Sequence, residues 1–212
     1  MRSYRVEDSK KYLRPEASMW SQVVHEDIAL MPTPLAMQPT EYIRKSWEGR
    51  DYGQTKSLSV ASVHDGHNWA IRVSWPGVSV EGKDFPDAIA VALPISGKPA
   101  LILMGAPDAP IHILRWQANK EGAHSIVATG IGQSRPGPGG IQIGAQAEAK
   151  DGVRSVVITR ALGHGKDIAP LAVGKKTGVG FALWMGGNDE RAGIKAFSLD
   201  WTELVLDAKE SS

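Results

Sequence analysis

A lysine interrupts an apolar stretch late in the sequence, in RAGIKAFSLDW at residues 191–201. If residues 194–199 are extended, side chains alternate between two faces, and Lys195 shares its face with Phe197 and Leu199. An ammonium group among apolar neighbours must reach solvent, pair with an opposite charge or lose its proton. Lys195 is therefore a candidate for unusual chemistry, and a strand-end lysine whose tip reaches solvent is the ordinary alternative.

Met104 is the second candidate, in the segment ALILMGAPDAPIHILRW at residues 100–116. Alternation puts apolar side chains on both faces of residues 100–105, which predicts a strand buried on both sides with Met104 at its end. Its place at the end of a strand, before Gly105 and a loop bounded by prolines, is what makes Met104 unusual. Most buried methionines only fill core volume, so that interpretation stays open.

Histidine is a common metal ligand, so the six histidines of the chain are also considered. His112 lies in a predicted strand on the face of Leu114 and Trp116, where it is either a donor close to a ligand or a core histidine with its hydrogen bonds satisfied. HDGH at residues 64–67 is predicted to be a turn, because Asp-Gly is a hairpin signal. The full set of candidates is His25, His64, His67, His112, His124 and His164.

Period-2 patterns and β-branched runs dominate the chain, and turn residues interrupt them often. These patterns predict an all-β fold, an antiparallel β-sandwich with few short helices. A short helix is expected near residues 39–48, where Thr40 could cap it, and a surface turn is the alternative. The predicted strands span residues 27–33, 57–65, 68–77, 88–95, 100–105, 111–118, 123–131, 141–151, 154–162, 178–186, 193–199 and 202–207.

Composition limits the class of protein. The 212 residues suit one domain, predicted over residues 21–208, with residues 1–20 as an N-terminal arm. The formal net charge of +1 is too small to indicate binding to nucleic acid. No run of apolar residues is long enough to span a bilayer. The absence of cysteine excludes disulfides and iron–sulfur ligation by this chain. The N-terminal residues do not read as a signal peptide, so an exported chain would have had its signal removed.

The seven tryptophans raise a different function, a carbohydrate-binding module in which exposed rings stack on sugars. Most of them lie inside alternating apolar patterns, which favours core packing. An enzyme lacks support, because no nucleophile elbow, histidine–carboxylate metal motif or phosphate loop is present. The rings that could serve a sugar-binding surface are Trp20, Trp47, Trp69, Trp75 and Trp116.

Two segments carry a resemblance to a known family. FPDAIAVALPI with ALILMGAPDAPIHILRWQA, within residues 85–118, and GFALWMGGNDERAGIKAFSLDWTELVL, residues 180–206, occur in this order and at a compatible separation. They resemble the haem b-binding gamma subunits of molybdoenzymes of the dimethyl sulfoxide reductase type. The family includes the gamma subunits of ethylbenzene dehydrogenase, dimethylsulfide dehydrogenase, chlorate reductase and selenate reductase.

The resemblance implies one haem b with Met104 and Lys195 as axial ligands, and Trp184 and Phe197 beside it. An amine binds iron only when deprotonated, which fits an apolar site around Lys195. With both axial positions filled, the haem would pass single electrons without binding oxygen or substrate. The haem propionates have four candidate cationic partners, for which solvated surface charge is the alternative: Arg115, Lys175, Lys176 and Arg191.

The resemblance also implies partners and a compartment. The chain would be a non-catalytic, periplasmic electron-transfer subunit in a heterotrimer with a molybdenum-cofactor alpha subunit and an iron–sulfur beta subunit. It would exchange electrons with a soluble c-type cytochrome or another periplasmic carrier. The substrate of such a complex is selected in a different subunit, so these residues do not determine it.

Overall fold

The structure, a computed structural model, describes residues 1–79, 85–139 and 141–210. The one α-helix of these residues, α1, spans Glu41–Trp47, and five 3-10 helices are short: η1 Ser9–Tyr12, η2 Ser18–Gln22, η3 Leu35–Met37, η4 Leu101–Leu103 and η5 Gly186–Asn188. The strands are β1 Arg2–Arg5, β2 Glu26–Ala29, β3 Met31–Pro32, β4 Ser57–His64, β5 Asn68–Pro76, β6 Ala88–Pro94, β7 Ile111–Gln117, β8 Ala123–Gly130, β9 Gln133–Pro136, β10 Ile143–Lys150, β11 Val153–Ala161, β12 Gly163–Gly165, β13 Ile168–Leu171, β14 Lys176–Trp184, β15 Ala196–Phe197 and β16 Thr202–Glu210.

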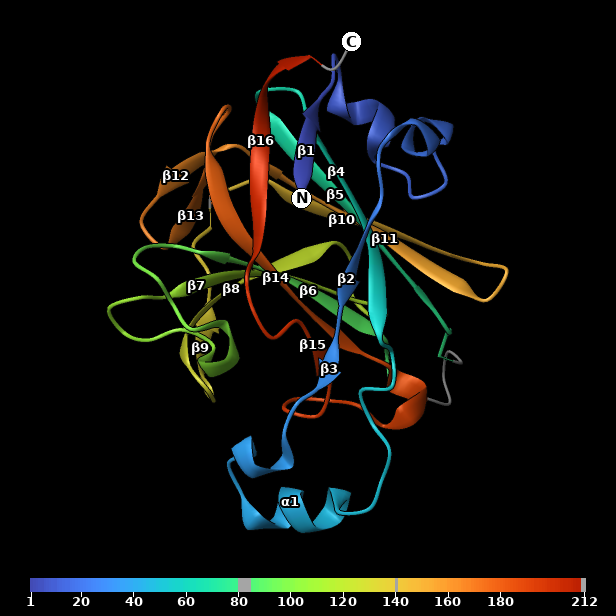
Figure 1. The fold of residues 1–212 in the computed structure, drawn as a ribbon, viewed down its shortest axis with the longest axis vertical. Coiled ribbons are helices and arrows are strands. Elements are labelled where there is room, and N and C mark those ends of the chain that lie inside the picture. Colours follow the sequence, from blue (N-terminus) through green and yellow to red (C-terminus); the bar gives the residue numbers. More distant parts are fainter. Residues whose placement is uncertain (80–84, 140, 211–212) are drawn as a thin grey trace.

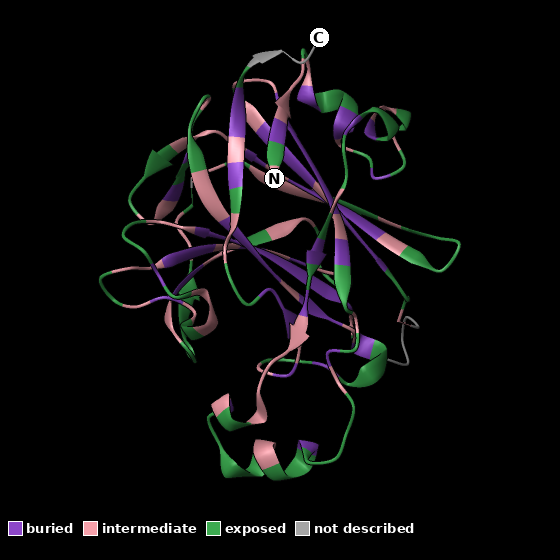
Figure 2. Cartoon of the chain, in the orientation of Figure 1, coloured by how far each residue is buried: buried purple, intermediate pink, exposed green. Residues whose placement is uncertain are grey.

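The predicted β-sandwich is confirmed (Figure 1). One hydrogen-bonded path runs through the strands in the order β10-β11-β5-β4-β1-β16-β14-β6-β7-β8-β9 and curls over a shared core. Trp75 of β5 and Trp116 of β7 meet in that core with ring centroids 6.5 Å apart. Figure 2 shows the buried residues concentrated along these central strands.

The β6 strand is buried on both of its faces, as its continuous apolar run predicts. Ile89, Val91 and Leu93 point into the main core. Ala88 and Ala90 point the other way and form a separate apolar cluster that includes Trp184 of β14. The outer face of this layer therefore has an apolar surface of its own.

The segment at residues 100–105 differs from the predicted strand. It forms η4, in which the Met104 amide donates to the Leu101 carbonyl oxygen at 2.9 Å and the Leu103 amide donates to the Ala100 carbonyl oxygen at 3.1 Å. Its apolar residues have no neighbouring strand to pair with, and Leu101 instead packs on the sheet at Gly180. None of the three η4 residues is buried and Leu103 is 50% exposed, so the predicted burial on both sides is wrong as well as the predicted strand. An apolar run alone does not separate a strand from such a loop.

The segment at residues 193–199 is also mostly irregular, since only Ala196 and Phe197 form a strand, β15. The chain bends on either side of this pair, so alternation does not extend to Leu199, which is 46% exposed. Lys195 and Leu199 therefore do not share an apolar face. Four short strands lie outside the predicted set: β1, β9, β12 and β13.

Residues 1–20, expected as an N-terminal arm, are joined to the sheet by a strand and by buried aromatic side chains. Strand β1 lies between β4 and β16 and is parallel to both of them, an exception to the antiparallel pairing elsewhere. Tyr12 and Trp20 are buried and pack edge to face, with ring centroids 5.1 Å apart. The charged residues that suggested an arm alternate with the few side chains that attach this segment to the sheet.

Helix α1 forms where the capping pattern placed it. The Thr40 side chain accepts a hydrogen bond from the Ile43 amide at 3.3 Å, and Trp47 at the last turn is buried. The helix therefore replaces the surface-turn alternative. No helix in the described part of the chain is long and apolar enough to cross a membrane.

Replacing Trp20 with alanine tests whether the N-terminal segment is part of the cooperative fold. We expect Trp20→Ala to lower the free energy of unfolding by about 3–5 kcal/mol, because the ring is 2% exposed and its Nε1 donates to the Tyr12 carbonyl oxygen at 3.1 Å. Urea denaturation measures the change. The control Tyr42→Ala removes a ring that is 81% exposed and should change the value by less than about 0.5 kcal/mol. Equal, small effects would show that residues 1–20 are an independent arm.

Candidate functional site

A cavity of about 370 Å³ lies on the outer face of the layer formed by β14, β6, β7 and β8. Its lining is mainly apolar, and it includes Met104 and Lys195. Trp184 and Phe197 line the same cavity. Four of the five residues proposed from the sequence as a cofactor site thus come together from distant parts of the chain.

The floor of the cavity consists of small side chains on two neighbouring strands. Ala90 of β6 pairs with Ala182 of β14, and Ala92 of β6 pairs with Gly180 of β14. A Cβ atom on Gly180 would lie 2.5 Å from Leu101 Cδ2, so a larger residue there would require the Leu101 side chain to move. The space above these residues exists because none of them projects into it.

Met104 follows η4 with left-handed backbone angles, φ 58° and ψ 36°. This conformation costs a residue other than glycine about 1 kcal/mol, and active sites and ligand clamps are enriched in such strained residues. Gly105 follows with φ 86° and fits tightly, since a Cβ atom there would lie 2.9 Å from the Ala109 carbonyl oxygen. The two residues turn the chain sharply and place the Met104 side chain at the cavity.

Lys195 is fixed through its backbone. Its carbonyl oxygen accepts hydrogen bonds from the Thr33 amide at 3.0 Å and from Thr33 Oγ1 at 3.2 Å. Its Nζ lies 5.5 Å from the Trp184 ring centroid, and no acidic side chain of the described residues forms an ion pair with it. Burial, assisted by the positive charge of Arg115, lowers the pKa of Lys195 to about 8. The amine therefore loses its proton more readily than an ordinary lysine.

His112 lies on the opposite face of β7 and does not line the cavity. Its Nδ1 accepts a hydrogen bond from the Ala169 amide at 3.4 Å, so the proton is on Nε2, which donates to Ser125 Oγ at 2.8 Å. Burial, together with the charge of Arg160, lowers the pKa of His112 to about 4. It is the core histidine of the two alternatives, and none of the other five histidines lines the cavity.

Several residues that line the cavity were not predicted from the sequence. Thr33, Met37, Gln38 and Pro39 come from the segment between β3 and α1 and form one wall. The Gln38 side chain donates to the Gly193 carbonyl oxygen at 3.0 Å, which joins this wall to the loop that carries Lys195. No sequence pattern marks these residues, because their positions depend on how two loops meet.

Of the four cations considered for propionates, Arg115 alone lines the cavity. Lys176 pairs with Glu203 at 2.9 Å on the surface, and the Arg191 guanidinium lies 4.5 Å from the Phe85 ring centroid. Lys175 is exposed. Surface charge is therefore the role that the structure gives to the other three.

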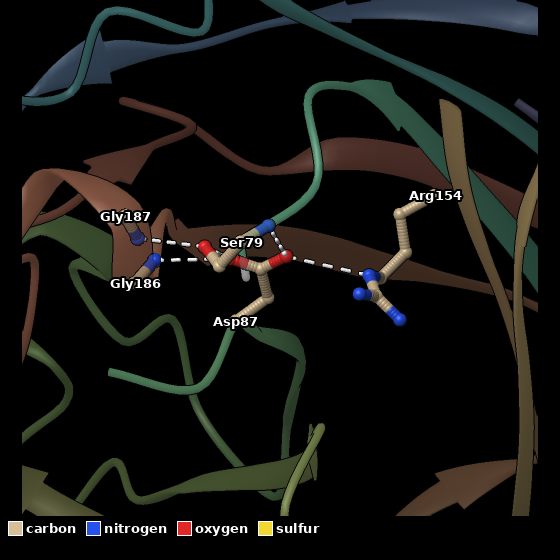
Figure 3. Close-up of polar contacts among 5 residues, drawn as sticks. All are labelled: Ser79, Asp87, Arg154, Gly186 and Gly187. Carbon is tan, nitrogen blue, oxygen red and sulfur yellow. Dashed lines mark hydrogen bonds and ion pairs between the residues drawn. The ribbon is translucent and has the colours of Figure 1, made fainter. Parts of the chain in front are cut away.

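Two buried carboxylates hold the loop at residues 185–195. Asp87 accepts hydrogen bonds from the Gly186 amide at 3.0 Å and from Ser79, and its Oδ2 lies 3.3 Å from Arg154 Nε (Figure 3). Ser79 Oγ in turn accepts from the Gly187 amide at 2.6 Å. These contacts fix the start of the loop. The sequence did not predict a role for Asp87 or Ser79.

The second carboxylate, Glu190, is 1% exposed. It accepts hydrogen bonds from the Gly53 amide at 2.7 Å and the Met185 amide at 2.9 Å, and burial raises its pKa. The Trp184 indole donates to the Ala192 carbonyl oxygen at 3.0 Å further along the same loop. The loop that carries Lys195 is therefore tied down along its length.

The rings proposed for sugar stacking are not available on the surface. Their exposed fractions are at most 6%, which confirms core packing for Trp20, Trp47, Trp69, Trp75 and Trp116. Among the described residues, no group of three or more His, Asp or Glu side chains could hold a metal ion. The cavity is thus the structural feature that combines an apolar lining with donor atoms.

Comparison with known sequences gives two relatives. The chain is 26% identical over 200 residues to the chlorate reductase subunit gamma of Ideonella dechloratans, a match that covers 90% of this chain and 78% of the relative. It is 24% identical over 204 residues to the dimethylsulfide dehydrogenase subunit gamma of Rhodovulum sulfidophilum, covering 90% and 75%. These relatives support the resemblance read from the two segments. No protein-family model matches the chain.

Comparison with solved structures bears on the fold alone. A family 9 carbohydrate-binding module from Caldicellulosiruptor kristjanssonii in complex with glucose has a TM-score of 0.56 at 12% identity, covering 100% of this chain and 97% of that one. The same type of module in complex with cellotriose has a TM-score of 0.51 at 12% identity, covering 100% and 96%. A shared sandwich does not carry a shared ligand.

Replacing Asp87 tests the support of the loop. We expect Asp87→Asn to lower the free energy of unfolding by about 3 kcal/mol, because a fully buried carboxylate is lost and Arg154 keeps an unpaired charge. Urea denaturation gives the value. Glu203→Gln, which removes an exposed ion pair with Lys176, is the control and should change it by less than about 1 kcal/mol. A loss for Asp87→Asn no larger than the control's would exclude this structural role.

Acid should destabilise the protein through His112. Its folded pKa of about 4 is below its usual value of about 6.5, so between these pH values the unfolded chain binds more protons than the native one. The free energy of unfolding therefore falls as pH is lowered through this window, by up to about 3 kcal/mol in total.

Denaturant midpoints at several pH values measure this dependence. His112→Gln should weaken it, and the remainder includes His64, whose pKa burial also lowers. His164→Gln replaces an exposed ring and should leave the pH dependence unchanged. The same slope in His112→Gln as in the parent protein would contradict the assignment.

Proposed function

We propose that this chain is the electron-transfer gamma subunit of a periplasmic molybdenum oxidoreductase and that it holds one haem b in the cavity. One observation carries the proposal: Met104 and Lys195, the two predicted axial ligands, line the same apolar cavity although they come from separate loops. The gamma-subunit relatives support the same role.

The residues of the cavity fit this cofactor. A thioether and an amine are both donors that iron accepts, and they are the two donor groups that the unusual local features identify. The floor of Ala90, Ala92 and Ala182 leaves space for a flat group, and apolar side chains surround it. Trp184 and Phe197 add aromatic surface at the Lys195 side.

When bound, haem supplies a one-electron couple at its iron. The Met104 thioether would favour the reduced form of such a couple, and the Lys195 amine would serve as a donor in its neutral form. Burial and Arg115 bring the pKa of Lys195 down to about 8, so this release requires much less free energy than for a lysine in water. Two protein donors leave no place for oxygen or a substrate, so the chain itself performs no substrate chemistry.

The partners follow from the relatives' names and from the family resemblance. Chlorate reductase and dimethylsulfide dehydrogenase have subunits called gamma, and we extend a complex of that kind to this chain. The other subunits would be an alpha subunit with the molybdenum cofactor and a beta subunit with iron–sulfur clusters. Electrons would pass between the beta subunit and a soluble c-type cytochrome or similar periplasmic carrier.

Absorption spectra of the purified protein reconstituted with haemin test the proposal. We expect a low-spin b-type spectrum with 1:1 stoichiometry. Met104→Ala and Lys195→Ala should each open a coordination position, seen as a high-spin form or new carbon monoxide binding, and weaken haemin binding by roughly 10-fold or more. Met37→Leu removes another thioether from the same cavity and should keep the low-spin spectrum.

The outcomes distinguish failure of the function from failure of its ligand assignment. Absence of stoichiometric haemin uptake by the folded protein would refute the haem site as a whole. Unchanged low-spin spectra in both Met104→Ala and Lys195→Ala would move the ligands elsewhere, and a change in Met37→Leu alone would identify the other thioether. Binding of glucose or cellotriose without haemin uptake would favour a sugar-binding module.

A further inference from the structure

Arg115 lies where the apolar cavity adjoins a second, more open groove. It shares the outer face of β7 with Ile113 and pairs in register with Ala90 of the cavity floor. Arg115, Ile126 and Ser134 line both the cavity and the groove. A molecule in the cavity would therefore present one edge to the groove at this guanidinium.

The Arg115 side chain is half-buried and has no anionic partner among the described residues. Its Nε is buried without a hydrogen-bond acceptor, and no Asp or Glu side chain forms an ion pair with it. A guanidinium stays charged at all ordinary pH values, and a buried charge without a partner is costly. Its contact with the Trp184 ring, 4.9 Å from the guanidinium carbon to the centroid, offsets only part of that cost. The group is thus ready to accept an anion.

The groove beyond Arg115 has positive and neutral character. Lys120, His124 and Arg135 line it, and none of the described residues that line it is acidic. Arg135 is already paired, at 2.8 Å, with Asp167. Arg115 and Lys120 therefore remain as the charges that an anionic edge would meet.

Lys195 lies close to Arg115, on the same aromatic ring. Its Nζ and the Arg115 guanidinium both lie over the Trp184 ring, at 5.5 and 4.9 Å from the centroid, so the positive charge of Arg115 disfavours a second charge on the amine. A guanidinium suits a carboxylate, with which it can form two parallel hydrogen bonds.

We propose that Arg115 binds a propionate carboxylate of the haem at the boundary between the cavity and the groove. The proposal rests on the function proposed above and adds an orientation: the propionate edge faces the groove, and the apolar edge faces the alanine floor and the aromatic wall. A planar guanidinium can donate two parallel hydrogen bonds to one carboxylate, which a lysine cannot do.

Titration with haemin and with its dimethyl ester, in the same detergent-containing buffer, tests this role by absorption. The ester keeps the iron and the ring but lacks the negative charges. We expect the parent protein to bind haemin roughly 10-fold or more tightly than the ester. Arg115→Gln should lower haemin affinity to about that of the ester while the ester's affinity stays within about twofold. Arg115→Lys should recover part of the preference, and Lys120→Gln, the matched groove control, should retain most of it.

The outcomes separate this inference from the function on which it rests. Equal binding of haemin and ester by the parent protein would overturn the role of Arg115, without the need for any variant. An undiminished preference for haemin in Arg115→Gln would overturn it too, while low-spin spectra that depend on Met104 and Lys195 would leave the haem site standing. If the parent protein binds neither compound, the proposed function itself is refuted.

Discussion

The structure depends on strands that are apolar on both of their faces. In most sandwiches one face packs in the core and the other is solvated. Here β6 contributes Ile89, Val91 and Leu93 to the main core, while Ala88 and Ala90 face outward into a second apolar region. Because the outward residues are small, loops can cover this face and still leave a space of about 370 Å³. A layer with larger outward residues would fill that space with its own side chains.

The loops that close this space are held by polar groups, which are expensive to bury. Asp87 and Glu190 are almost fully inaccessible, and each accepts backbone hydrogen bonds from the loop that carries Lys195. Buried charges add little net stability on average, but they restrict geometry strongly because only one arrangement satisfies them. The apolar face thus creates the room, and the buried carboxylates determine how the covering loop lies over it.

The sequence predicted the regular strands well, because alternation and β-branched runs depend on neighbours along the chain. It failed at residues 100–105 and 193–199, where the apolar residues lie mainly in loops: η4 has no buried residue, and only Ala196 and Phe197 pair as a strand. The sequence showed that Lys195 lies among apolar residues. The expectation that it shares an apolar face with Leu199 was wrong, because Leu199 is exposed. Met37, Asp87 and Glu190 gave no signal, because their positions follow from contacts between segments far apart in the chain.

If Met104 and Lys195 bind the proposed haem, their fixed backbones have a consequence for electron exchange. The Lys195 carbonyl oxygen accepts two hydrogen bonds from Thr33, and Met104 is held in a left-handed turn by its neighbours. A redox centre exchanges electrons rapidly when few atoms must move as its charge changes, and donors positioned in advance keep that movement small. In an electron carrier, the strained turn and the anchored carbonyl would lower the reorganisation energy. The backbone strain at Met104 would thereby favour rapid electron transfer both to and from the protein.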